Sequence, residues 1–267
     1  MTVSGDPSVA PVPSVAGTSV PAGWRLFARY AYAPNVKGYC GPPQGAALEQ
    51  VARGAGAGVD VVAIAKRFSG AWPYHVLIAE LAGIDDPLDE RVGRAYWTGS
   101  DLTGQIDAPG LGEMLIERFA RQAGHYWKHL DRGLLDEITP THAFHVLAVY
   151  PWSRLLASGR PEPLQVLDSC RIRSGEVVAT TADRLVVAVR SLHWDGRQLR
   201  LSGLEREDVT WWPAEDSGVS AAMVPEPGIR VAIHWGHVCE PLSAADHDQL
   251  EYWTGVQLEA TNRRLGR

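Results

Sequence analysis

The feature that most constrains the fold is a change of pattern after Ser158. Before this residue, apolar side chains recur mostly at helical spacing, whereas after it short runs rich in valine, leucine and isoleucine alternate apolar with polar residues. The strand-like runs cover residues 164–172, 176–181, 184–194, 198–204 and 229–234. Short, closely spaced strands separated by turn residues predict a small β-barrel. Asp195-Gly196 marks a tight hairpin within it.

The first half is predicted to be all helical. Helical patterns cover residues 46–54, 59–68, 71–82, 89–97, 112–122, 125–130 and 141–156, with Pro151 interrupting the last. A final helix is predicted from Ser243, because Ser243 at the N-cap and Asp246 three residues later form a capping-box pattern. The expected fold class is therefore α+β, with an all-helical N-terminal domain followed by a β-barrel and a C-terminal helix.

Composition divides the chain into three segments. Residues 1–22 are mostly small residues and prolines, which predicts a disordered tail. Residues 23–160 form the predicted helical domain and residues 164–267 the barrel with its closing helix. Between them, residues 158–163 are rich in glycine, proline and polar groups and are typical of a linker.

Charge and composition exclude several classes of function. The net charge of −6 leaves no basic excess to neutralise phosphates, so no nucleic-acid partner is expected. No apolar run approaches the roughly 20 residues of a membrane helix. Three cysteines do not make a disulfide framework, and we expect reduced thiols in the cytoplasm. Neither a phosphate-binding glycine-rich loop nor a Gly-x-Ser-x-Gly elbow is present.

Cys170 and His234, at opposite ends of the strand-rich segment, are the principal candidates for metal or client binding. A thiolate binds soft metals, and an imidazole suits iron, nickel or zinc. Arg171 and Arg173 are expected to lower the pKa of the thiol. The alternative is a small buried thiol and a hydrogen-bonded core histidine. Cys239 either joins this site or is a structural thiol.

The helical half holds a possible second site. Cys40 lies in a glycine-flanked turn, Gly38-Tyr39-Cys40-Gly41-Pro42, where it is a metal ligand, a nucleophile, a docking loop or only part of a turn. Two histidine pairs at helical spacing could converge on zinc, iron or nickel, or could serve only in packing: His125 with His129, and His142 with His145. A docking face of aromatic side chains is also a candidate, formed by Trp24, Tyr30, Tyr32, Trp72 and Tyr74, or by Tyr96 and Trp97.

The strand-rich segment also resembles a known family. The residues that carry the resemblance are Cys170 with Gly175 five positions later, Val177-Val178, the run 185–189, Gly228, His234-x-Gly236 and the helix that follows Leu242. In this order they are similar to the HypC/HybG/HupF chaperones of NiFe-hydrogenase assembly. In that family the cysteine follows the initiating methionine, whereas Cys170 is internal, so only its thiol is available.

The resemblance implies an OB-like barrel that holds iron with cyanide and carbonyl ligands, transiently, through its cysteine. It also implies two partners, a HypD-like scaffold and the hydrogenase large subunit. Residues 27–35 and 38–42 resemble uncharacterised actinobacterial proteins of the same layout. We therefore expect a hydrogenase-maturation chaperone or accessory factor, not an enzyme. The alternative is a metal- or cysteine-dependent enzyme in the helical domain, with the barrel as a docking module.

Overall fold

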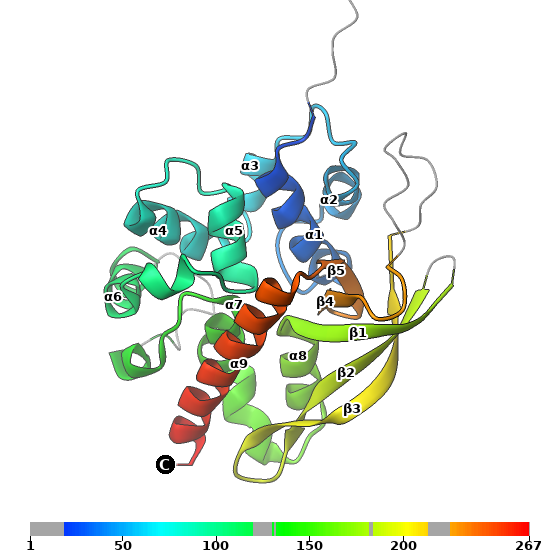
Figure 1. Ribbon diagram of the computed structural model, residues 1–267. Helices are drawn as coiled ribbons and strands as arrows, with labels where there is room; N and C mark the ends of the chain where they lie inside the picture. Colours follow the sequence, from blue (N-terminus) through cyan, green and yellow to red (C-terminus); the bar gives the residue numbers. More distant parts are fainter. Residues whose placement is uncertain (1–18, 120–129, 131, 182–183, 213–224, 267) are drawn as a thin grey trace, which may run out of the picture.

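The computed structural model describes residues 19–119, 130, 132–181, 184–212 and 225–266. Helices make up the first half, and five strands followed by a long C-terminal helix make up the second (Figure 1). The α+β class predicted from the sequence is confirmed. Among the described helices, none is both long and apolar enough to cross a membrane.

Six α-helices build the first part of the helical half: α1 (Ala22–Val36), α2 (Gly45–Ala52), α3 (Val61–Ala65), α4 (Trp72–Ala82), α5 (Glu90–Trp97) and α6 (Ala108–Phe119). Shorter turns follow: the 3-10 helices η1 (Thr103–Gln105), η3 (Arg132–Glu137) and η5 (Pro151–Ser158), α7 (His142–Phe144) and the π-helix η4 (His145–Val149). The sequence pattern missed α1. The predicted helix 125–130 lies, apart from Leu130, outside the described residues.

Local chemistry explains several helix boundaries. The Asp60 side chain accepts the backbone N–H of Ala63 and begins α3, and the Asp89 side chain accepts that of Arg91 and begins α5. Gly83, with φ of 65°, ends α4 in the left-handed conformation that glycine adopts without steric cost. Of these helices, α5 packs against both α1 and α4.

The strand predicted over 164–172 was wrong, because this segment forms α8 (Glu162–Cys170). Pro161 and Pro163 suit a helical first turn, where a backbone N–H is not needed. Leu167 and Cys170 are buried at a spacing of three residues, which is a helical face. Cys170 is consequently the last residue of a helix and not the start of a barrel strand.

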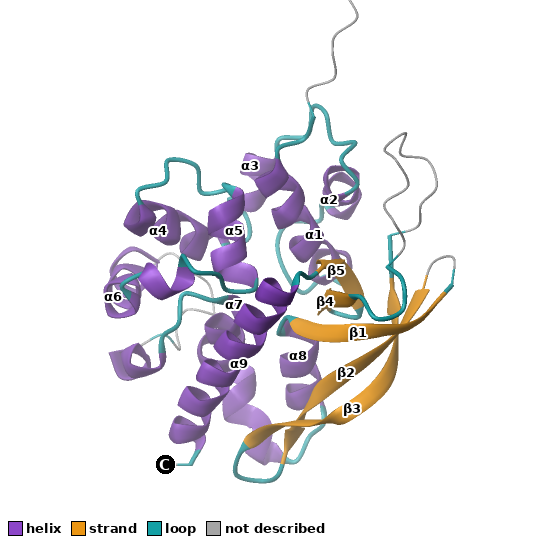
Figure 2. Ribbon diagram, viewed as in Figure 1, coloured by secondary structure: helices purple, strands orange, loops and turns teal. Residues whose placement is uncertain are grey.

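Five strands pair in the closed order β1-β2-β3-β5-β4 (Figure 2). They are β1 (Arg173–Thr180), β2 (Arg184–Trp194), β3 (Leu199–Thr210), β4 (Arg230–His234) and β5 (His237–Pro241), and the last was not predicted. All pairings are antiparallel except β3 with β5, which pair parallel through Thr210 and His237 alone. The predicted hairpin between β2 and β3 is present and turns through Asp195-Gly196, where Gly196 has φ of 94°.

The C-terminal helix α9 (Ala244–Leu265) lies between the helical half and the strands β1–β3 (Figure 1). Its predicted capping box is confirmed, since Ser243 accepts the N–H of Asp246 and the Asp246 carboxylate accepts that of Ser243. Gln257 is fully buried in the middle of α9 and accepts a hydrogen bond from Thr139 at 2.8 Å. Asn262 of α9 also bonds to the backbone of Leu199 in β3, so the helix joins the segment before α7 to the strands.

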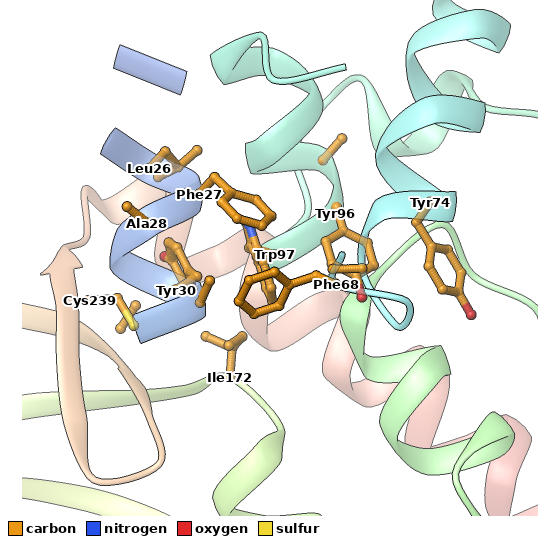
Figure 3. Packing of buried hydrophobic residues seen from close by; sticks show 14 of the residues in the cluster. Leu26, Phe27, Ala28, Tyr30, Phe68, Tyr74, Tyr96, Trp97, Ile172 and Cys239 are labelled. Carbon is orange, nitrogen blue, oxygen red and sulfur yellow. The ribbon is translucent and has the colours of Figure 1, made fainter. Parts of the chain in front are cut away.

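One cluster of buried apolar side chains draws members from both halves of the chain. Figure 3 shows Ile172, just after α8, beside the aromatic side chains of the helical half. The proposed docking role of Tyr30, Tyr74 and Trp97 was wrong: all three are buried in this core, and Tyr30 stacks on Trp97 with ring centroids 5.3 Å apart. Val20 also belongs to the cluster, so the predicted tail packs against the core at its end.

Candidate metal centre

Three buried side chains from three different segments converge at the C-terminal end of α8. The ligand atoms of His142, Cys170 and His234 all lie within 4.8 Å of one another. His142 Nε2 is 3.9 Å from Cys170 Sγ and 3.0 Å from the Cys170 carbonyl oxygen. The structure thus brings together Cys170 and His234, and it adds His142, which was predicted to belong to a separate site.

The turn between β4 and β5 fixes His234 next to Cys170. His234 pairs with His237, and the two residues between them have positive φ, 54° at Trp235 and 72° at Gly236. Two left-handed central residues are typical of a type I′ hairpin turn, which matches the twist of the strands. The Trp235 N–H donates to the Ser169 carbonyl oxygen at 2.9 Å and so ties the turn to α8. A tryptophan in this conformation is strained, which is commonest where a side chain has a functional position.

The hydrogen bonds of His234 determine which ring nitrogen is available. Its Nδ1 lies 2.7 Å from the Tyr30 carbonyl oxygen. A carbonyl only accepts, so Nδ1 carries the proton and Nε2 carries the lone pair. Within the described residues, Nε2 is buried and has no hydrogen-bond partner. Metal-binding histidines have this arrangement, with one nitrogen bonded to a carbonyl and the other directed at the ion.

Tyr96 supports His142 in a similar way. Its hydroxyl lies 3.0 Å from His142 Nδ1 and 3.3 Å from the Gly70 carbonyl oxygen. Without an ion, His142 Nε2 donates to the Cys170 carbonyl. Moving the proton to Nδ1, where the Tyr96 oxygen can accept it, frees Nε2 to bind a metal. His142 opens α7, and the π-helix η4 follows at once, a rare conformation often found at functional sites.

Burial sets the protonation of all three groups. It lowers the pKa of His234 to about 4, opposed by the carbonyl groups of Tyr30 and Cys170. Burial, together with the neighbouring His234 and His145, lowers the pKa of His142 well below its ordinary value. It raises the pKa of the Cys170 thiol. At neutral pH the cluster therefore consists of two neutral imidazoles and a protonated thiol.

The expected effect of the two arginines on the thiol was wrong. Arg171 forms an ion pair with Asp168 at 2.8 Å, and Arg173 forms one with Glu207 at 2.7 Å. Both guanidinium groups are thereby engaged elsewhere, and desolvation of Cys170 dominates its pKa.

A small cavity of about 70 Å³, which we call the inner cavity, adjoins the cluster. Its lining comprises Pro34, Tyr39, Cys40, His142, Tyr150, Trp152, Val166, Cys170, His234 and Trp235. The Tyr39 ring stacks on Trp235 with centroids 3.9 Å apart, and both residues line the cavity. The inner cavity therefore joins Cys40 of the helical half to the Cys170–His234 pair.

The end of α1 holds the loop that carries Cys40. Asn35 Nδ2 donates to the carbonyl oxygens of Cys40 and Pro42, the former at 2.8 Å, and the Tyr39 N–H donates to the Pro34 carbonyl oxygen at 2.8 Å. Burial raises the pKa of Cys40 to about 12. Its sulfur does not belong to the group of mutually close ligand atoms.

The remaining predicted candidates lie elsewhere. His125 and His129 fall outside the described residues. The His145 ring is 6.4 Å from that of His142, centroid to centroid, and its Nδ1 lies 3.4 Å from the Tyr74 hydroxyl. Cys239 is buried in the main core, where its thiol lies 3.9 Å from the His237 carbonyl oxygen, and it is not part of the cluster.

A larger pocket of about 320 Å³ lies between the sheet and α9. Charged residues of both signs line it, among them Arg171, Arg190, Arg230, Glu176 and Glu251. Its charges largely balance, and among the described residues it contains no cluster of metal ligands. The smaller inner cavity, in contrast, is lined by two thiols and two imidazoles, those of Cys40, Cys170, His142 and His234.

One thiol and two imidazoles form a donor set for zinc, iron, nickel or copper. Three protein ligands beside a cavity are typical of metal sites that keep one position for water or substrate, whereas structural zinc sites are filled by four protein side chains. The cluster can therefore hold a metal ion with one position facing the inner cavity.

Residues 19–267 match a family of unknown function (DUF6390), and the chain belongs to this family. No curated protein matches the chain. No solved structure matches it either.

Proposed function

We propose that this protein binds one transition-metal ion through His142, Cys170 and His234, with one coordination position open to the inner cavity. The lone pair of His234 Nε2 carries the proposal. It is buried, lacks a hydrogen-bond partner among the described residues, and lies within 4.8 Å of two further ligand atoms. An unsatisfied buried polar atom costs about 1–3 kcal/mol, and a bound ion would remove that cost.

Cobalt(II) titration tests this proposal, since cobalt reports a bound thiolate by a charge-transfer band in the near ultraviolet. We expect one ion per chain and a band that disappears in Cys170→Ala. Cys239→Ala is the matched control, because Cys239 is also a buried thiol but lies outside the cluster. The proposal fails if both variants keep the band or if both lose it.

A second candidate function is an accessory role in NiFe-hydrogenase maturation. One observation favours it: Cys170, through which the HypC-like resemblance implies iron binding, and His234 of the matching His-x-Gly motif belong to the same cluster. In this role the metal is iron with cyanide and carbonyl ligands, held transiently. The partners are the hydrogenase large subunit and a HypD-like scaffold, and the closed strand order supports an OB-like barrel. The protein would act in the cytoplasm, where its free cysteines stay reduced.

Infrared spectroscopy separates the two roles. Protein purified together with hydrogenase assembly factors shows cyanide and carbonyl stretching bands if it carries the iron group, and the bands are absent from Cys170→Ala. A permanently bound metal ion without such bands favours the first proposal, in which the open coordination position binds a ligand or substrate.

A further inference from the structure

We propose that the open position takes a small monoanion, which reaches the metal through a second pocket beside Cys40. This inference rests on the proposed metal site and specifies what that site binds. Two features support it: the charge of a bound metal ion, and the residues that line the access route to the inner cavity.

A metal ion in this cluster would carry uncompensated charge. A divalent ion that displaces the Cys170 proton leaves a centre with net charge +1, because both imidazoles are neutral. Among the residues that the structure describes, no carboxylate lines the inner cavity. A buried charge without a counter-charge is costly, so a ligand bearing one negative charge is favoured over a neutral one.

The size of the inner cavity limits this ligand. At about 70 Å³ the inner cavity is small, well below the roughly 150 Å³ of a cavity that holds benzene. Hydroxide, or an anion of two or three heavy atoms, fits this space. A larger anion would have to extend into the neighbouring pocket, past Tyr39, Cys40 and Tyr150.

A second pocket, here called the outer pocket, has a volume of about 260 Å³ and shares Tyr39, Cys40 and Tyr150 with the inner cavity. Its further lining consists of Gly38, Gly41, Arg67, Ser69 and Gly70. Within the described part of the chain, Arg67, an exposed residue, is the one charged group in this lining. A single cation in a carboxylate-free pocket attracts anions and raises their local concentration.

The shared residues place Cys40 and the two tyrosines between solvent and metal. Gly41 has φ of 76°, and a Cβ there would lie 2.3 Å from the Phe68 ring. A Cβ at Gly70 would lie 2.8 Å from His145 Nε2. Glycine at both positions therefore permits the close packing of the outer pocket wall. We infer that Cys40 lines the passage and does not occupy the open position.

Azide titration of the cobalt-loaded full chain tests this inference. Azide is a linear monoanion, and its binding to cobalt shifts the visible bands. We expect saturable binding, weakened about 3- to 10-fold in Arg67→Gln through loss of a nearby positive charge. Lys66→Gln is the matched control: Lys66 is the adjacent exposed cation, outside the outer pocket lining, and its loss should change affinity less than about twofold. Benzoate, a larger anion, should bind more weakly than azide.

Three results overturn this inference and leave the proposed metal site standing. The first is a visible spectrum that azide does not change although the thiolate-to-cobalt band is present; the metal site would then stand without the anion site. Another is an equal loss of azide affinity in Arg67→Gln and Lys66→Gln. The third is azide binding that occurs only in Cys40→Ser, because Cys40 would then fill the fourth position. A protein that takes up no cobalt overturns the metal site and this inference together.

Discussion

Metal binding by this protein should release one proton per ion between about pH 5.5 and pH 7. Burial lowers the pKa of His234 to about 4 and that of His142 well below its ordinary value, so both imidazoles are neutral in this range. Burial raises the pKa of the Cys170 thiol, which is therefore protonated and must lose its proton to bind. The range ends near pH 7 because water bound to a metal begins to ionise there.

The magnitude follows from this proton count. Below the thiol pKa, the thiolate fraction rises tenfold for each pH unit, so the dissociation constant should fall about tenfold per unit, or about 1.4 kcal/mol. Histidines with ordinary pKa values near 6.5 would add further protons and steepen the slope below that pH. An ionised thiol would remove the slope altogether.

Competition with a chromophoric chelator gives the dissociation constant at each pH. Calorimetry in buffers with different heats of ionisation gives the proton count independently. Cys239→Ala should keep the slope, and Cys170→Ala should lose both the slope and most of the affinity. If the wild-type protein released no proton, or about three protons, for each ion bound, burial would not set the ionisation of the cluster.

Three further predictions concern parts of the fold around the site. Burial lowers the pKa of His75 from 6.5 to about 4, so the unfolded chain binds the extra proton as pH falls through this window. The free energy of unfolding should consequently fall by roughly 3 kcal/mol from pH 6.5 to pH 4 because of this residue. Urea denaturation should show that His75→Gln lacks this part of the pH dependence. Gly41→Ala should destabilise the fold more than Gly38→Ala, whose φ of 78° is similar but whose Cβ would meet nothing within 4 Å. Measured by urea denaturation, the free energy of unfolding should fall by about 1 kcal/mol in Gly38→Ala and by about 2 kcal/mol or more in Gly41→Ala. Equal losses in the two variants would refute the packing argument. Trp235→Asn suits the positive φ of 54° but removes a ring that lines the inner cavity. Stability should change by less than about 1 kcal/mol, since relief of strain offsets lost stacking, while a chelator removes the metal faster; an unchanged release rate would show that this ring does not limit access to the metal.

The sequence was informative where local pattern decides structure. The capping box of α9, the hairpin after β2 and the helical periodicity of α4 and α5 depend on residues close in the chain, and these elements were predicted. Segment 164–172 was assigned wrongly because a short apolar run fits a strand as well as a buried helix. Here two prolines at the start and the buried pair Leu167 and Cys170 were the signals of a helix.

The site was only partly accessible to sequence reasoning. Cys170 and His234 stood out by residue type and by the resemblance. His142 joins them from 28 residues before Cys170, through packing that no local spacing encodes. The thiol pKa was misjudged because neighbours in sequence, Arg171 and Arg173, direct their charges to Asp168 and Glu207. Burial, a property of the whole fold, decides that value instead.

X-ray absorption at the zinc edge, on protein loaded with one equivalent of zinc, tests the central claim most directly. We predict one sulfur at about 2.3 Å, two imidazole nitrogens at about 2.0–2.1 Å and one light ligand in the open position. Cys170→Ala should lose the sulfur shell, whereas Cys239→Ala should keep it. A shell without sulfur, or one that Cys170→Ala leaves unchanged, would contradict a metal centre built from His142, Cys170 and His234.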